Sequence, residues 1–216
     1  MNKQQARKEI IETVKLFVAK GLTLGSWGNV SVRVGDTLAI TPSGRNYADL
    51  KPADIVIVGE KHPLQPSSEL ALHQKIYRER KDINAIIHTH SIYATALACQ
   101  HIDLPILTED IAQLANGKVI KCAKYAESGT DALANNAVKA LGNGLAVLLA
   151  NHGAVACGTN LHQALLFAEL LEKASQIFSI VKSMGGKVNA LPFAKINDLK
   201  EFYFNCYAKR QEGEKI

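Results

Sequence analysis

Residues 84–90 are the strongest constraint on how this chain can fold. They read Asn-Ala-Ile-Ile-His-Thr-His, an apolar run that ends in two histidines two positions apart. Residues i and i+2 of an extended strand project to the same side of a sheet, so His88 and His90 would share one face and could bind one cation. We therefore expect a sheet with a candidate cation site where this strand ends.

Length and composition are those of an ordinary globular chain. The 216 residues are 47% hydrophobic and 21% charged, enough apolar material for a full-sized core, so a single domain spanning residues 1–216 is expected. No apolar stretch approaches the roughly 20 residues of a membrane-spanning helix. The first 20 residues lack the apolar centre of a signal peptide. We therefore expect a cytoplasmic protein without a membrane partner.

Charge and cysteine content narrow the range of ligands. The formal charge of +5 favours anionic partners, but the lysines and arginines are spread along the chain and form no basic tract. A phosphorylated metabolite is therefore a better expectation than nucleic acid. The four cysteines include no Cys-x-x-Cys pair, which indicates reduced thiols and not a thiolate zinc site. A bound metal would use nitrogen and oxygen ligands.

Helical and strand patterns alternate along the chain. Apolar residues at helical spacing predict helices over residues 4–20, 69–80, 91–100, 130–141 and 160–184. Alternating or fully apolar runs predict strands that end near Val34 and that span residues 37–41, 55–58, 84–90, 145–150 and 154–157. Residues 105–108 are predicted as a connector or short strand.

A third histidine extends the candidate cation site. His152 follows the apolar strand 145–150, so three histidines lie at strand ends, where an α/β-type sheet presents side chains to a cleft. Three such ligands with an open position are typical of catalytic zinc, and Glu69 offers a fourth, oxygen ligand. Two plainer interpretations stay open: a histidine at a strand end is usually a satisfied polar group, and Glu69 could simply interact with a helix dipole. The remaining histidines are interpreted as structural: His62, His73, His101 and His162.

Three loops of small residues could hold a phosphate. Residues 25–29, the pair Ser43-Gly44 and the pair Ser67-Ser68 offer hydroxyls and backbone N–H groups. The last pair lies at a predicted helix N-terminus, where phosphate is favoured. Each loop by itself is more often an ordinary turn or cap, and it is their joint occurrence that favours one phosphate site.

Several short segments, taken together, resemble a known family. They are Gly28-Asn-Val-Ser31, Ile40-Thr-Pro-Ser-Gly44, Pro66-Ser-Ser-Glu69, His88-Thr-His90 and Asn151-His-Gly153. In this order and spacing they resemble the class II aldolase/adducin head family, and they are most similar to the L-fuculose-1-phosphate aldolases. The resemblance covers nearly the whole chain and implies an α/β fold, a three-layer α/β/α sandwich with a largely antiparallel central sheet. It also implies a homotetramer with active sites at subunit interfaces.

The resemblance assigns roles to residues of this chain. His88, His90 and His152 would bind Zn²⁺, and Glu69 would be a ligand at rest and the base once substrate displaces it. The phosphate would be held by small residues of the three loops: Ser26, Gly28, Asn29, Ser43, Gly44, Ser67 and Ser68. The implied reaction is the reversible retro-aldol cleavage of a ketose 1-phosphate, of the L-fuculose 1-phosphate type, into dihydroxyacetone phosphate and a small aldehyde.

One departure from the family's pattern affects the expected substrate. Glu109 stands where fuculose-type relatives tend to carry a tyrosine that exchanges a proton with the aldehyde-side oxygen. Glu109 could equally be a solvated loop carboxylate. Tyr207 resembles a C-terminal tyrosine that some relatives send into a neighbouring subunit's site, although Tyr203 nearby leaves the register open. Both Glu109 and Tyr207 are kept as catalytic candidates.

Other functions on the same fold stay open. A methylthioribulose-1-phosphate dehydratase would use a glutamate in the region of Glu109, and a sugar-phosphate 4-epimerase generally has aspartate at the position of Glu69. A non-catalytic head like that of adducin has lost the metal ligands, which this chain retains. The aldolase is therefore the first hypothesis, with a short or deoxygenated aldehyde preferred over L-lactaldehyde.

Overall fold

A mostly antiparallel sheet forms the middle layer of the protein. The computed structural model describes residues 1–207, and its main sheet has seven strands. In spatial order they are β3 (Val56–Ile57), β2 (Thr37–Ile40), β1 (Asn29–Val34), β4 (Ala85–Thr89), β9 (Gly153–Gly158), β8 (Ala146–Leu149) and β7 (Cys122–Ala123). Neighbouring strands pair antiparallel, except that β7 and β8 are parallel. The largely antiparallel sheet implied by the resemblance is confirmed.

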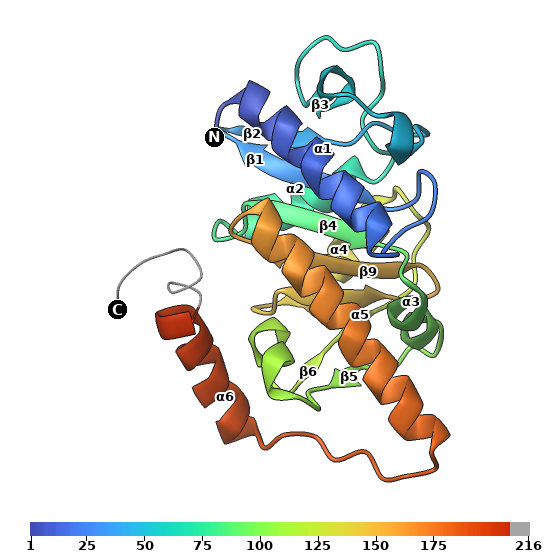
Figure 1. Ribbon diagram of the computed structural model, residues 1–216, viewed down its shortest axis with the longest axis vertical. Helices are drawn as coiled ribbons and strands as arrows, with labels where there is room; N and C mark the ends of the chain where they lie inside the picture. Colours follow the sequence, from blue (N-terminus) through green and yellow to red (C-terminus); the bar gives the residue numbers. More distant parts are fainter. Residues whose placement is uncertain (208–216) are drawn as a thin grey trace.

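Helices cover both faces of this sheet (Figure 1). The first face carries α1 (Lys3–Ala19), α3 (Ile92–Cys99) and α5 (Leu161–Ser183), and the second carries α2 (Leu70–Glu79) and α4 (Asp131–Leu141). On β4, Ile87 belongs to the first apolar layer and Ile86 to the second, because successive side chains of a strand point to opposite faces. Burial on both faces explains why this strand is apolar throughout. The predicted three-layer α/β/α sandwich is confirmed.

The limits of two helices follow from their capping residues. The side chain of Asn160 accepts a hydrogen bond from the backbone N–H of Gln163 (2.8 Å) at the start of α5. Thr130 accepts one from the N–H of Leu133 (3.3 Å) at the start of α4. Beyond α5, Gly185 has a φ of +72°, a conformation that suits glycine and that ends the helix.

The sequence patterns miss several short or irregular elements. Strand β5 (Leu104–Pro105) overlaps the predicted connector or short strand 105–108 only at Pro105. It forms a separate small sheet with β6 (Val119–Ile120), and β5, β6 and β7 have only two residues each, too few to show a period. The chain then continues beyond α5 into α6 (Phe193–Phe202) and a π-helix, η4 (Tyr203–Tyr207). These pack through the buried residues Ile196 and Tyr203. Among the described residues, no helix is long and apolar enough to cross a membrane.

The register of β4 with its two neighbours positions the candidate site. Asn29, the first residue of β1, pairs with His88 of β4. Thr89, the last residue of β4, pairs with Ala154 near the start of β9. Because β1 and β9 run antiparallel to β4, the end of β4 lies beside the beginnings of both strands. The turn from β8 to β9, which contains His152, therefore lies at the same edge of the sheet.

Candidate active site

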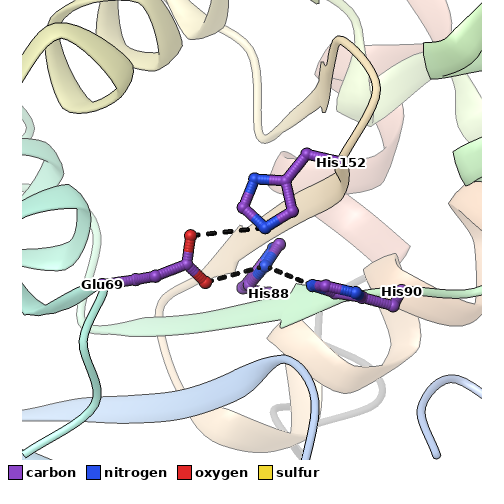
Figure 2. A group of neighbouring side chains, drawn as sticks. All are labelled: Glu69, His88, His90 and His152. Atoms are coloured by element: carbon purple, nitrogen blue, oxygen red, sulfur yellow. Dashed lines mark hydrogen bonds and ion pairs between the residues drawn. The ribbon is translucent and has the colours of Figure 1, made fainter. Parts of the chain in front are cut away.

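Four side chains from distant parts of the chain converge at this edge (Figure 2). Glu69, His88, His90 and His152 each offer one ligand atom, and these atoms all lie within 4.8 Å of one another. Glu69 Oε2 lies 2.9 Å from His88 Nε2, and Glu69 Oε1 lies 3.4 Å from His152 Nε2. The two nitrogens of the strand-end pair, His88 Nε2 and His90 Nε2, are 2.9 Å apart. The structure thus brings together all four residues that the sequence suggests as metal ligands.

Glycines allow the neighbouring backbones to approach β4 closely. A Cβ added at Gly153 would collide with the carbonyl oxygen of Thr89, and one added at Gly28 would collide with the carbonyl oxygen of His88. Just before His152, Asn151 has a φ of +54°, a left-handed conformation that asparagine adopts more readily than most residues. The close approach of the backbones explains the glycines at positions 28 and 153, and the left-handed conformation explains the asparagine at position 151.

The fully buried His88 has one defined orientation in the site. Its Nδ1 lies 2.9 Å from the carbonyl oxygen of Ala154, which can only accept, so Nδ1 carries the hydrogen. In the neutral ring, Nε2 then directs its lone pair at the cluster. A backbone carbonyl that fixes the tautomer of a histidine in this way is a common partner of metal-binding imidazoles.

The pKa values of these side chains follow from burial and mutual charge. Burial lowers the pKa of His90 to about 3 and that of His152 to about 4, and the nearby His88 adds to both effects. Burial also lowers the pKa of His88, but the carboxylate of Glu69 outweighs it and the net shift is upward. Burial raises the pKa of Glu69, yet the charge and hydrogen bond of His88 dominate and hold it well below its usual range. At neutral pH the cluster therefore contains a carboxylate and two neutral imidazoles, and the carboxylate favours the protonated form of His88.

This arrangement fits a divalent cation. Three imidazole nitrogens and a carboxylate oxygen are the donors that catalytic zinc sites use, and a cation would replace the proton between Glu69 and His88. The edge of the site is open, because His90 and His152 are only partly buried. A substrate atom could therefore reach a bound cation from this open side.

Two neutral side chains hold the carboxylate of Glu69 from outside the ligand set. Asn29 Nδ2 donates to Oε2 (3.0 Å), and Ser128 Oγ donates to Oε1 (3.1 Å). The sequence analysis does not identify Ser128. The signal that could have found it is the small-residue run Ser128-Gly129 before the helix cap Thr130, which has the same composition as the three phosphate loops.

A cavity of about 510 Å³ opens next to the cluster. All seven residues suggested for phosphate binding line it: Ser26, Gly28, Asn29, Ser43, Gly44, Ser67 and Ser68. Glu69, His90 and His152 also face it, so the three small-residue loops and the candidate metal ligands share one space. Trp27, which the sequence analysis leaves out, lines the same cavity with its ring centroid 5.7 Å from that of His90. The part that each loop takes in binding phosphate stays a prediction.

Glu109 and Tyr207, the two further catalytic candidates, lie elsewhere. Both line a second cavity of about 330 Å³ whose walls come from α5, α6, η4 and the 3₁₀ helix η3 (Glu109–Leu114). Neither lines the first cavity, so the described part of a single chain does not bring them to the candidate metal ligands. Their catalytic roles stay predictions.

Comparison with known proteins identifies the family. Residues 8–179 match the family described as Class II Aldolase and Adducin N-terminal domain. The chain is 41% identical to the 5-deoxy-D-ribulose 1-phosphate aldolase of Bacillus thuringiensis serovar kurstaki, over 84% of this chain and 88% of that protein. It is 40% identical to the 5-methylthioribulose-1-phosphate/5-deoxyribulose-1-phosphate aldolase of Rhodospirillum rubrum, over 79% and 78% of the two chains.

Fuculose-type enzymes are similar over a greater length. The L-fuculose phosphate aldolase of Escherichia coli K12 is 35% identical, over 98% of this chain and all (100%) of that protein. A solved structure of an L-fuculose 1-phosphate aldolase superposes with a TM-score of 0.88 at 38% identity, covering 93% of this chain and 96% of the other. Sequence and fold agree over most of the described chain, so the protein belongs to the class II aldolase and adducin N-terminal domain family, among its lyases.

Proposed function

We propose that this protein is a zinc-dependent aldolase that reversibly cleaves a ketose 1-phosphate into dihydroxyacetone phosphate and a small aldehyde. The observation that carries this proposal is that one cavity is lined by three of the four candidate metal ligands, Glu69, His90 and His152, and by all three small-residue loops. A phosphate held by the loops would place the neighbouring carbons of the sugar beside Glu69 and the histidines. The net charge of +5 suits an anionic substrate.

The donor set favours Zn²⁺ as the cofactor. Glu69, His88, His90 and His152 would hold it, and when bound it would supply Lewis-acid stabilisation of negative charge on the substrate oxygens. Imidazole donors suit zinc, whereas magnesium and calcium prefer sites built from oxygen ligands.

Glu69 is the proposed proton carrier. Cleavage breaks the bond between C3 and C4: the C4 hydroxyl loses its proton as the aldehyde forms, and C3 gains a proton to give dihydroxyacetone phosphate. The carboxylate of Glu69 faces the cavity, and Asn29 and Ser128 hold its two oxygens. Once substrate displaces it from the cation, a carboxylate held in this way would stay beside the substrate carbon and could exchange a proton with it.

The proposal includes a homotetramer with sites at subunit interfaces. Glu109 and Tyr207 line a cavity other than the one beside the metal ligands of their own chain. If either acts on the aldehyde-side oxygen, it does so in the site of a neighbouring copy. An oligomer that joins the two cavities would complete the site.

The proposed substrate is a 5-deoxypentulose 1-phosphate or a ketose phosphate with a similarly apolar end. Glu109 replaces the tyrosine of fuculose-type relatives, which indicates a different aldehyde from L-lactaldehyde. The relatives named for 5-deoxyribulose 1-phosphate are 41% and 40% identical, compared with 35% for the fuculose-type enzyme of Escherichia coli. Acetaldehyde or a methylthio-substituted acetaldehyde would then be the second product.

A second candidate function is dehydration of the same class of substrate. The observation that favours it is again Glu109, since the related methylthioribulose-phosphate dehydratases use a glutamate in this region. An aldolase breaks a carbon–carbon bond, whereas a dehydratase removes water and leaves the carbon skeleton intact. The two reactions therefore give products of different mass.

One screen tests these proposals. Zinc-loaded protein is incubated with dihydroxyacetone phosphate and, separately, acetaldehyde, methylthioacetaldehyde, glycolaldehyde and L-lactaldehyde, and products are identified by mass. We expect condensation with the first two at higher kcat/KM than with L-lactaldehyde. A clear preference for L-lactaldehyde would overturn the proposed substrate. Incubation with methylthioribulose 1-phosphate that yields only a product lighter by one water would establish the dehydratase instead.

A further inference from the structure

A ladder of buried polar groups lies behind Glu69, away from the cavity. On the strand, Asn29 and Ser31 are two positions apart and share one face of β1. Across from them, His73 and Tyr77 follow Glu69 at intervals of four along one face of α2. All five side chains are buried, and His73 has 0% exposure.

The hydrogen bonds of this ladder have only one consistent direction. The carboxylate of Glu69 can only accept, so the amide of Asn29 must direct its nitrogen at it and its oxygen Oδ1 at His73. Nε2 of His73 must then donate to Asn29 Oδ1. The other ring nitrogen, Nδ1, has no hydrogen in the neutral ring and accepts from Ser31 Oγ (2.6 Å).

Tyr77 completes the order at the far end. Since the single hydrogen of Ser31 Oγ goes to His73, the hydroxyl of Tyr77 donates to Ser31 (2.9 Å). Reversing any link would bring two acceptors or two donors face to face in a buried site, which costs about 1–3 kcal/mol for each unsatisfied group. The tautomer of His73 therefore decides which end of the Asn29 amide faces Glu69.

We propose that His73 is a positioning residue of the metal site: its Nε2–H fixes the amide of Asn29 so that Glu69 receives a hydrogen-bond donor. This assignment goes beyond the interpretation of His73 as merely structural. It rests on the proposed metal site, because Glu69 is one of the four ligands. Outer partners of metal ligands typically contribute about 10- to 100-fold to metal affinity or activity.

Burial keeps His73 in the form that this role needs. Burial, together with the nearby His88, lowers the pKa of His73 to about 3, against the smaller opposing effect of Glu69. The ring is therefore neutral at pH 7, with one N–H and one acceptor nitrogen. In a doubly protonated ring Nδ1 would also carry a hydrogen, so it could no longer accept the hydrogen bond from Ser31.

Two amide substitutions separate the functions of the two ring nitrogens. The amide of glutamine reaches about as far as Nε2 of histidine, and that of asparagine only about as far as Nδ1. His73→Gln can thus still donate to Asn29, whereas His73→Asn can contact Ser31 but leaves Asn29 Oδ1 without its donor. Both replacement side chains are polar and similar in size, so the two variants should perturb the packing of the surrounding core to a similar extent.

The experiment measures Zn²⁺ affinity of the metal-free proteins by competition with a chromophoric chelator, alongside kcat/KM and the unfolding temperature. We expect His73→Asn to bind Zn²⁺ about 10-fold more weakly than the parent protein, and His73→Gln to stay within about 3-fold. Tyr77→Phe removes an equally buried hydroxyl at the far end of the ladder, and its zinc affinity should stay within about 2-fold of the parent. Equal losses in all three variants would show a purely structural role and overturn the inference.

A double variant tests the route through Asn29. In an Asn29→Ala background the amide is absent, so adding His73→Asn should weaken zinc binding no further, even where either change lowers the unfolding temperature. Additive losses would overturn the proposed route. A parent protein that binds no Zn²⁺ would refute the metal site itself, whereas tight parent binding with an unaffected His73→Asn variant would refute only the role of His73.

Discussion

Glu69 and Glu109, which line the first and second of the cavities described above, differ in how firmly the protein holds their carboxylates. Glu69, beside the first cavity, is 5% exposed and contacts side chains from β1, β4, the β8–β9 turn and the loop before α4. Glu109, in the second cavity, is exposed at the start of η3. The apolar walls of that cavity come from α5 and the C-terminal helices. A single chain thus fixes the first carboxylate completely and leaves the second open to contacts from outside.

The two glutamates differ in how far their carboxylates are preorganised. Hydrogen bonds reach both oxygens of Glu69, from the buried Asn29 to Oε2 and from Ser128 to Oε1, so the position of this carboxylate is settled when the chain folds, before any substrate arrives. Within residues 1–207, the exposed carboxylate of Glu109 has no such support, and it gains a defined position only if a further surface covers it. Substituting a residue that supports the first cavity should therefore impair zinc binding or activity within its own chain. The contribution of the second cavity to activity should depend on a neighbouring copy of the chain.

The largest effect is expected from His152→Ala. Loss of this ligand should remove bound zinc and lower kcat/KM at least about 1,000-fold, because a cation supplies several kcal/mol of charge stabilisation. Zinc content by elemental analysis and kcat/KM are the measurements. The matched control is His162→Ala, an exposed histidine at the start of α5, which should keep both zinc and activity. Full zinc retention in His152→Ala would remove the basis for treating the first cavity as a metal centre.

A smaller effect is expected in the second cavity. Glu109→Gln should lower kcat/KM about 100-fold, the scale of a lost proton-transfer group, while zinc content stays at the parent level. Tyr207→Phe should act in the same direction. Unchanged kinetics in both variants would assign these residues to the surface and not to catalysis.

Mixing the two kinds of variant tests whether the cavities meet between subunits. Chains with His152→Ala and chains with Glu109→Gln are unfolded and refolded together, and activity is compared with that of each alone. If sites are shared, a mixed oligomer contains some sites in which the Glu109→Gln chain supplies all four metal ligands and the His152→Ala chain supplies an intact Glu109. We expect the mixture to regain activity that neither variant shows; its failure to do so would count against shared sites.

The smallest effect concerns the pH dependence of stability near the first cavity. Since the pKa of His73 falls from 6.5 to about 3 on folding, the unfolded chain binds more protons between these values, so stability is complete above pH 6.5 and falls as the pH drops toward 3. From pH 7.5 to 5.5 this one group should cost about 1 kcal/mol. Urea unfolding of metal-free protein should show that His73→Gln lacks this part of the decline. Glu109→Gln should keep it, and equal slopes for the two variants would contradict the assignment.

Several features of the site could be predicted from the sequence, for local reasons. The apolar run before His88 and His90 needs burial on both faces, and this makes it a central strand with two imidazoles at its end. The same reasoning holds for the strand before His152. Helix limits at Thr130 and Asn160 follow from side chains that cap locally. Each of these inferences depends on neighbours within a few residues.

Other features could not be predicted, because they depend on contacts between distant segments. Ser128 contacts Glu69, 59 positions earlier, and the small-residue run Ser128-Gly129 does not by itself indicate so distant a partner. The regular helix α6 has an irregular apolar pattern, because little of it beyond Ile196 is buried.

Taken alone, the sequence determined the class of the longer, regularly patterned elements and the donor atoms available to the site, because hydrophobic period and donor atoms are properties of single segments. Only the tertiary structure decided which side chains Glu69 and His73 contact. A glutamate at a helix start and a histidine one turn later could both be structural, and the sequence leaves that interpretation open. The pairing of β1 with β4 brings Asn29 between Glu69 and His73, and this contact distinguishes a candidate metal ligand with a fixed carboxylate from an ordinary dipole partner.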